Sequence, residues 1–271
     1  MLNLSDADFQ RLYTYIQSHY GIDLSKKKNL IVSRLSNTLA SEGYKDFSSY
    51  VNDIVSGKDK ERTITMLNKL TTNYTYFLRE IEHFEFMEKT VLPALAQKHQ
   101  KDHSLSIWSA GCSSGEEPYT ISMYLREYFG AKGGAAWDTR ILATDISQNI
   151  LNSAIHPSYQ EEALSKLPAA WKHKYFTKKP DGSYTVSQEI RNNVIFKTFN
   201  LMDPIQFRRQ FDLIFCRNVM IYFDQPTKDA LVRRFYNATV PGGYLFIGHS
   251  EGLNKATCPY KYLLPAIYQK A

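Results

Sequence analysis

The chain has 271 residues, of which 43% are hydrophobic and 14% aromatic, enough for one large or two smaller domains with a core. Lys and Arg number 33 and Asp and Glu 27, and the resulting net charge of +6 is low for a dedicated nucleic-acid binder. No apolar run approaches the ~18 residues that span a bilayer, the N-terminus lacks a signal-peptide pattern, and three scattered cysteines form no metal or disulfide framework, so we expect a cytoplasmic protein without metal or membrane insertion.

The first part of the chain has the periodicity of amphipathic helices. Between residues 9 and 20, apolar side chains recur at the i, i+3, i+4, i+7 spacing that gathers them on one helical face. Ser5 and Asp8 have the spacing of a capping box at the start of this helix, and Gly21 is a suitable residue to end it. The same periodicity at 47–54 predicts another helix of this kind.

The helical pattern continues beyond these two segments. It recurs at 64–70 and again from about Phe77, where a longer helix is expected. Pro93 should kink or interrupt that longer helix, because proline lacks the amide hydrogen that a helix interior needs. We therefore expect an N-terminal helical domain at residues 1–72 and a linker helix at 73–104.

From residue 105 onward the pattern changes to alternating strands, loops and helices. Pro118 suits the first turn of the helix after the first strand, and Ser147 suits the cap of the helix after the second. Strands alternating with helices predict a mainly parallel, doubly wound α/β sheet. The expected strands are 105–108, 140–146, 194–200, 211–218 and 244–250, with a helix at 226–239 between the last two.

One region interrupts this alternation. Residues 156–193 contain a polar, helix-like piece and then the segment KYFTKKPDGSYTVSQEI. The pair Asp181 and Gly182 within it is typical of a β-hairpin turn. We interpret the region as a small antiparallel insertion in a sheet domain that covers residues 105–271.

The loop after the first strand, SAGCSSGEE, does not fit a phosphate-binding loop. Gly111 and Gly115 let the backbone turn tightly, but the G-x-G-x-x-G spacing of dinucleotide sites is absent. Glu116 and Glu117 would oppose a bound phosphate and favour a cation. Negative side chains also suit a helix start, so a plain capping role fits one of the two glutamates.

Polar residues also follow the other strands, and ligands of open parallel sheets bind at such ends. Asp145, 30 residues beyond the last glycine of the loop, suits the hydroxyls of a ribose better than a capping role. Asn200 offers an amide for a base edge and Leu201 an apolar surface, although a turn-forming asparagine fits equally well. Arg217 and Asn218 end the very apolar strand DLIFC, where a binding cleft would open.

Taken together, the segments TNYTYFLRE, WSAGCSSGEEPYTISM, ATDIS, FNL, DLIFCRNVMIYFD and GGYLFIGHSE resemble the bacterial chemotaxis receptor methyltransferase family, the CheR type, over nearly the whole chain. The resemblance implies a Rossmann-like, S-adenosylmethionine-dependent methyltransferase sheet with an N-terminal helical domain and a small antiparallel β insertion. It also implies a protein-glutamate O-methyltransferase that converts chemoreceptor glutamates to methyl esters and releases S-adenosyl-L-homocysteine.

The resemblance also implies a set of cofactor-binding residues. Arg79 would suit the carboxylate of the cofactor, Asp145 its ribose, and one of the two glutamates after the loop would be an acidic contact. No residue is assigned as a catalytic acid or base, because an acceptor glutamate with a pKa of ~4.3 is already ionised near neutral pH. The implied set is Asn73, Thr75, Arg79, Glu116, Glu117, Asp145, Asn200, Leu201, Arg217 and Asn218.

A dense basic segment suggests how the substrate would dock. Lys26, Lys27, Lys28 and Arg34 have no acidic residue between them, and by the resemblance they would contact the acidic signalling helices of a chemoreceptor. The alternative is a solvated helix face. The compact turn KKPDGSY lacks the longer glycine-rich loop of family members that hold the receptor's C-terminal peptide tether, so we expect action without the tether.

Three other functions remain as alternatives. A methyltransferase of another substrate would share the cofactor fold, but RNVMIY lacks the prolines typical of enzymes that methylate amino groups of bases. A non-catalytic signalling adaptor could keep the fold without turnover. A nucleotide-dependent dehydrogenase would require the glycine spacing that is missing here.

Overall fold

The computed structural model describes residues 3–71, 74–130 and 136–271. The chain divides into two compact units. The helical unit comprises Met1–Tyr74 together with Tyr222–Lys228, and the sheet unit comprises Thr75–Ile221 and Asp229–Ala271. Our predicted boundary between residues 72 and 73 falls outside the described residues. No helix in the described part of the chain is both long and apolar enough to cross a membrane.

The helical unit is built from amphipathic helices that bury their apolar faces against one another. Ser5 begins the first helix by accepting the amide of Asp8 at 3.1 Å, and Gly21 ends it with a φ of 72°, so both predicted caps are confirmed. The first helix packs on the third, and the second on the fourth. The four are α1 (Asp6–Tyr20), α2 (Lys28–Ser41), α3 (Phe47–Val55) and α4 (Lys60–Leu70).

A short segment that is distant in sequence completes the helical unit. Phe223 forms an antiparallel bridge with Ile22, and the amide of Asp23 donates to the Tyr222 carbonyl at 2.8 Å. Asp224 accepts a hydrogen bond from Gln17 Nε2 on α1 at 2.6 Å. These contacts explain why residues 222–228 belong to this unit, although the strand before them belongs to the sheet.

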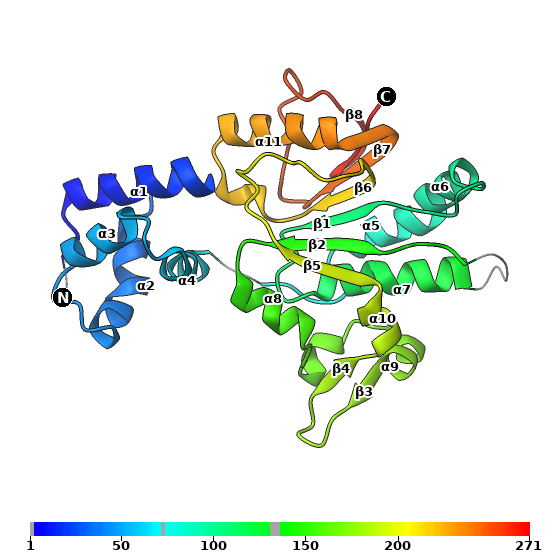
Figure 1. Ribbon diagram of the computed structural model, residues 1–271, viewed down its shortest axis with the longest axis horizontal. Coiled ribbons are helices and arrows are strands. Elements are labelled where there is room, and N and C mark those ends of the chain that lie inside the picture. The colour runs from blue at the N-terminus through cyan, green and yellow to red at the C-terminus, as the bar shows by residue number, and fades with distance from the viewer. Residues whose placement is uncertain (1–2, 72–73, 131–135) are drawn as a thin grey trace. The chain divides into compact units, whose positions relative to one another are not determined.

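The sheet unit has a seven-stranded sheet with the order β5-β2-β1-β6-β7-β9-β8. The first five strands in this order are parallel, as predicted, and Figure 1 shows them side by side. The last two add an antiparallel hairpin that we did not predict. The strands are β1 (Ile107–Ala110), β2 (Ile141–Asp145), β5 (Val194–Thr198), β6 (Phe211–Cys216), β7 (Thr239–Ile247), β8 (Lys261–Leu264) and β9 (Ile267–Gln269).

The predicted long helix from Phe77 is wrong at its start. Leu78 and Glu80 have φ values of 60° and 55°, so a turn occupies these positions and the helix begins at Ile81. A π-helical turn then precedes Pro93, and the backbone stays helical through Val91 and Leu92, so Pro93 follows an interruption of the regular α-helix rather than a new start. These elements are α5 (Ile81–Phe86), a π-helix (Met87–Val91) and α6 (Leu92–Lys98).

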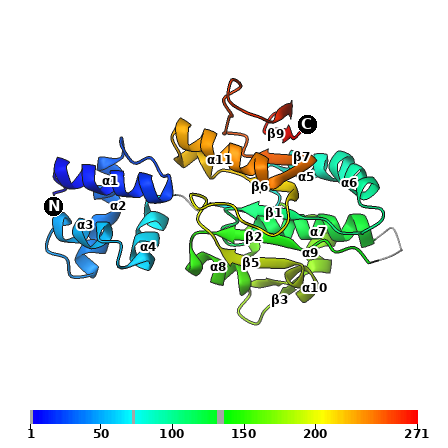
Figure 2. The same ribbon diagram turned by 45° about the horizontal axis from the view of Figure 1, so that its top comes forward.

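The remaining helices connect the strands, and the insertion contains a small hairpin. Strands β3 and β4, both labelled in Figure 1, pair antiparallel around a turn in which Gly182 has a φ of 84°, so the predicted insertion is confirmed (Figure 1 and Figure 2). The other elements are α7 (Glu116–Gly130), α8 (Gln148–Ile155), α9 (Ala169–Tyr175), β3 (Phe176–Lys178), β4 (Tyr184–Val186), α10 (Gln188–Asn192), α11 (Gln225–Ala238) and 3-10 turns at Glu161–Leu164 and Met220–Tyr222.

Trp108 on the central strand β1 is the centre of an aromatic cluster. It is fully buried, and its indole nitrogen donates to Thr144 Oγ1 at 2.9 Å. Its ring centroid lies 5.1–5.8 Å from four phenylalanine rings that come from the strand β6, the helix α11 and the connection between β5 and β6. These rings belong to Phe199, Phe207, Phe211 and Phe235.

We predict that Trp108→Ala lowers the free energy of unfolding of the sheet unit by about 3–5 kcal/mol, because it leaves a large cavity and an unpaired Thr144 hydroxyl. Urea denaturation followed by circular dichroism would measure the loss. Tyr262→Ala is the control, since Tyr262 is 56% exposed and its loss should cost less than about 0.5 kcal/mol. Equal effects of the two substitutions would contradict the prediction.

Candidate functional site

The loop between β1 and α7 is tight at both of its glycines. Gly111 has a φ of 81°, and its amide donates to the Thr144 carbonyl on β2 at 2.8 Å. A Cβ on Gly111 would lie 2.4 Å from the Val219 side chain. Gly115 has a φ of 96°, and a Cβ there would lie 3.0 Å from the Tyr119 ring. Larger residues at either position would therefore force the loop to move.

Glu116 and Glu117 begin α7 and have different partners. Glu117 accepts hydrogen bonds from Ser109 Oγ at 2.7 Å and from Arg217 Nη1 at 2.9 Å. Glu116 is 5% exposed, accepts from the Ser114 hydroxyl at 2.7 Å, and has a pKa raised by burial. Glu117 thus already has a cation beside it, whereas no ion pair among the described residues involves Glu116.

Asp145 joins the loops that follow β1 and β2. Its Oδ2 accepts the amide of Ser113 at 3.0 Å and its Oδ1 accepts the amide of Ser147 at 3.0 Å. Burial raises the pKa of Asp145, and these amides partly offset that effect. Ser147 itself caps α8 by accepting the amide of Ile150 at 3.3 Å, so the capping role falls to Ser147. A carboxylate with one amide on each oxygen retains lone pairs for a ligand.

The residues after β5 form a turn. Asn200 Oδ1 accepts the amide of Met202 at 3.0 Å, which is the turn-forming arrangement that the sequence left open. Leu201 is 8% exposed. The contact of these two residues with an adenine base stays a prediction.

The segment TNYTYFLRE reaches the end of β6 through Arg79 and Glu80. Asn73 lies outside the described residues, and Thr75 is partly exposed. Arg79 is partly exposed and lies in the turn before α5, where its carbonyl oxygen accepts a hydrogen bond from Arg217 Nη2. The cofactor contacts expected of Thr75 and Arg79 stay predictions.

Arg217, at the end of β6, joins three of these segments. Its side chain is 2% exposed, and its guanidinium forms ion pairs with Glu117 at 2.9 Å and with Glu80 at 3.1 Å. It also lies over the Phe84 ring at 5.3 Å. One buried cation is thus shared by two carboxylates, so this part of the site keeps a negative balance.

Asn218 is held in a left-handed conformation by residues that we did not predict. Its φ is 60°, its amide donates to Glu251 Oε2 at 2.9 Å, and its side-chain amide donates to Glu80 Oε1 at 3.2 Å. Glu251 also accepts the amides of Ile221 at 3.1 Å and Gly248 at 2.5 Å. A carboxylate that collects three backbone amides fixes the path of the loop after β6.

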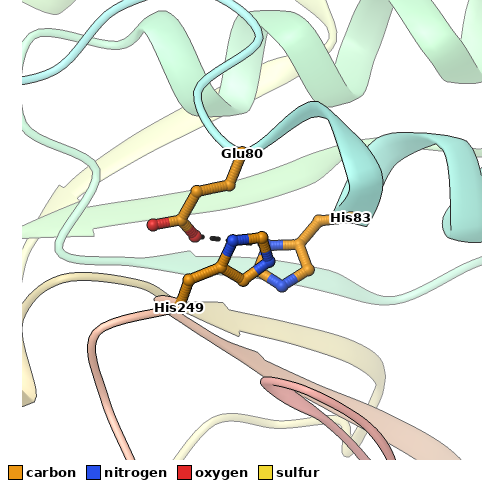
Figure 3. Close-up of side chains that lie close together, drawn as sticks. All are labelled: Glu80, His83 and His249. Atoms are coloured by element: carbon orange, nitrogen blue, oxygen red, sulfur yellow. Dashed lines mark ion pairs between the residues drawn. The ribbon is translucent and has the colours of Figure 1, made fainter.

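Glu80, His83 and His249 lie close together (Figure 3), with one potential ligand atom of each within 4.8 Å of the others. The Glu80 oxygens are engaged by Arg217 and Asn218, and the guanidinium of Arg217 would repel a metal ion. His83 is fully buried, and burial followed by the charge of Arg217 lowers its pKa to about 3. The geometry therefore favours a neutral His83 beside an ion pair over a metal centre.

The basic segment of the helical unit is only partly available to a partner. Lys26 and Lys27 are exposed at the start of α2. Lys28 pairs with Asp6 at 2.5 Å, and Arg34 Nη1 donates to the carbonyl oxygen of Lys69 at 2.9 Å. The N-terminal end of a helix carries a partial positive charge, which adds to the charges of these first two lysines.

Sequence reasoning missed Glu80 and Glu251 as parts of this site. Both stand inside segments that carried the family resemblance, TNYTYFLRE and GGYLFIGHSE, and Glu80 directly follows Arg79, which we did single out. Their partners, Arg217 and Asn218, are distant in the chain, so no local spacing indicated the contacts.

A mainly parallel sheet whose strand ends collect carboxylates, without a phosphate loop, fits the class of S-adenosylmethionine-dependent methyltransferases. The family model "CheR methyltransferase, SAM binding domain" matches residues 73–264, and "CheR methyltransferase, all-alpha domain" matches residues 7–71. The chain therefore belongs to the CheR methyltransferase family, and its cofactor is S-adenosylmethionine.

Curated relatives agree with this assignment. The chain is similar to the chemotaxis protein methyltransferase of Borreliella burgdorferi, with 41% identity over 99% of this chain and 96% of the relative. It is also similar to the chemotaxis protein methyltransferase of Escherichia coli, with 38% identity over 93% of this chain and 87% of the relative. Chemotaxis protein methyltransferase 1 of Pseudomonas aeruginosa is 35% identical over 96% of this chain and 95% of the relative.

The neutral state of His83 predicts a pH dependence of stability. Its pKa is lowered on folding, so the unfolded chain, with a pKa of about 6.5, binds the proton at higher pH. The folded state therefore keeps its full stability with respect to His83 above pH 6.5 and loses stability as the pH falls below 6.5. Between pH 7 and pH 5 the loss should be about 2 kcal/mol, since each pH unit below 6.5 costs about 1.4 kcal/mol.

His83→Phe keeps a ring beside Phe246 but cannot bind a proton. Urea denaturation of both proteins at pH 7 and pH 5 would measure the difference in their pH dependence. We expect a flatter pH dependence in the variant, because all other titrating groups are common to the two proteins. The same slope in both proteins would show that His83 is protonated in the folded state.

Proposed function

We propose that this protein transfers the methyl group of S-adenosylmethionine to glutamate side chains of chemoreceptors and thereby forms glutamate methyl esters. The printed names of the relatives, chemotaxis protein methyltransferases, support the chemotactic role. The choice of a carboxylate as acceptor is supported by the state of the titratable groups in the site, which is the observation that carries the proposal.

Four carboxylates of the site have a guanidinium or backbone amides as partners. Glu80 and Glu117 pair with Arg217, while Asp145 and Glu251 accept backbone amides. Burial opposes ionisation of Glu80, but Arg217 and Asn218 outweigh it and lower the pKa of Glu80, so this carboxylate is a poor proton acceptor and the site suits an acceptor that arrives already deprotonated. A glutamate side chain, with a pKa of ~4.3, meets this condition near neutral pH.

The residues present also fit the cofactor. When bound, S-adenosylmethionine supplies a methyl group made electrophilic by a positive sulfur. The tight glycine loop is followed by Glu116, whose buried carboxyl group has no cation beside it among the described residues, and a positively charged ligand there would favour its ionised form. We propose that the individual cofactor-binding residues implied by the resemblance hold the cofactor and exclude water around it.

The proposed reaction predicts that the product loses its methyl group in alkali. Incubation of the protein with methyl-labelled S-adenosylmethionine and membranes that contain chemoreceptors should label the receptor band. Mild base should then release the label as methanol, because carboxyl methyl esters hydrolyse and methylated nitrogen does not. Label that survives base treatment, or that appears in RNA added to the same reaction, would contradict the proposal and favour a different acceptor.

We further propose that Lys26 and Lys27 contact the acidic surface of the receptor. The double variant Lys26→Glu and Lys27→Glu should raise KM for the receptor by about fivefold, because two exposed ion pairs of about 0.5 kcal/mol each are lost. KM should also depend less on salt. The variant Lys45→Glu and Lys58→Glu has the same charge change at exposed positions of the helical unit and is the control. If both double variants raise KM equally, only net charge matters.

A further inference from the structure

Glu80 occupies a turn whose backbone is unfavourable for its residue type. The φ values of Leu78 and Glu80 lie in the left-handed region, which costs about 1 kcal/mol or more for each residue other than glycine. Such a conformation persists only where the surrounding contacts hold it. The Glu80 carboxylate makes contacts that can hold this left-handed conformation.

Both oxygens of Glu80 are used. Oε2 lies 3.1 Å from Arg217 Nη2, and Oε1 accepts from Asn218 Nδ2 at 3.2 Å. Burial opposes ionisation of Glu80, but the charge of Arg217 and the amide of Asn218 outweigh it, so the pKa of Glu80 is lowered. Glu80 is thus an ionised group that touches both residues at the end of β6.

His83 also lies next to the Glu80 carboxylate. Its Nδ1 lies 3.5 Å from Glu80 Oε2, and its ring packs against His249 with centroids 4.6 Å apart (Figure 3). Because His83 is buried and neutral, it does not compete with Arg217 for the charge of Glu80. The charge of Glu80 therefore acts on Arg217.

We propose that Glu80 is a positioning residue that orients Arg217 and Asn218 and, by balancing the charge of Arg217, determines how well the site tolerates the positive sulfur of the methyl donor. This inference rests on the proposed cofactor role of Arg217 and Asn218, and it does not depend on the acceptor. With Glu80 present, two carboxylates face one guanidinium. Without its charge, one carboxylate remains and the site becomes more positive.

The donor and its demethylated product are suitable probes, because S-adenosylmethionine carries a positive sulfur and S-adenosyl-L-homocysteine carries a neutral one. Calorimetry on the isolated protein gives both Kd values without any receptor. Glu80→Gln keeps the size of the side chain and removes its charge. The ratio of the donor Kd to the product Kd should rise about three- to tenfold, the effect of one unit charge at an effective dielectric constant near 20, partly screened.

Glu82→Gln is the matched control, since Glu82 is exposed in the first turn of α5, two residues from Glu80, and the substitution removes the same charge. Its Kd ratio should stay within about twofold of the wild-type value, as expected for an exposed, screened charge. An unchanged ratio in Glu80→Gln, or an equal weakening of both ligands, would overturn the inference. Loss of both ligands in all proteins, the wild type included, would instead count against the proposed cofactor site.

A second measurement tests the same coupling through stability and needs no ligand. Substitution of Arg217 by Met removes the group through which Glu80 acts, so a double-mutant cycle of urea denaturation isolates their coupling. Glu80→Gln should lower the equilibrium constant for folding about tenfold in the wild type. In the Arg217→Met background it should lower this constant less than about threefold. Equal effects in the two backgrounds would show that Glu80 does not act through Arg217.

Discussion

The buried ion pairs of Arg217 are the interaction on which the rest of the site depends. They join the end of β6 to the start of α7 through Glu117 and to the turn before α5 through Glu80. Removing one partner from a buried pair typically costs about 3–5 kcal/mol, because the remaining charge is left without compensation. Three segments that are distant in sequence are therefore held in one arrangement by a single guanidinium.

Other carboxylates of the site are held by backbone amides, as Glu80 and Glu117 are held by Arg217. Asp145 ties together the loops after β1 and β2, and Glu251 collects two amides from the loop after β6 and one from the residue after β7. Because amides carry only partial charges, they do not neutralise these carboxylates. This charge distribution suits a cationic donor and an acceptor that is already ionised.

Local patterns in the sequence predicted most elements of the fold. Periodicity and caps located α1, and the alternation of strands and helices predicted the parallel sheet. The predicted start of the helix at Phe77 was wrong, because tertiary contacts of Glu80 hold a left-handed turn where the apolar spacing favoured a helix. The hairpin of β8 and β9 was missed because its alternating pattern is only a few residues long. Contacts such as that of Glu117 with Arg217, 100 residues apart, leave no trace in local spacing.

The segment Tyr222–Lys228 has a consequence for recombining family members. Because Phe223 and Asp224 complete the helical unit from within the sequence of the sheet unit, the two units are interleaved rather than consecutive. A chimera that exchanges only the first 74 residues would combine α1 of one parent with a bridging segment of the other. Modular exchange between homologues therefore requires two crossover regions, one near residue 74 and one enclosing residues 222–228.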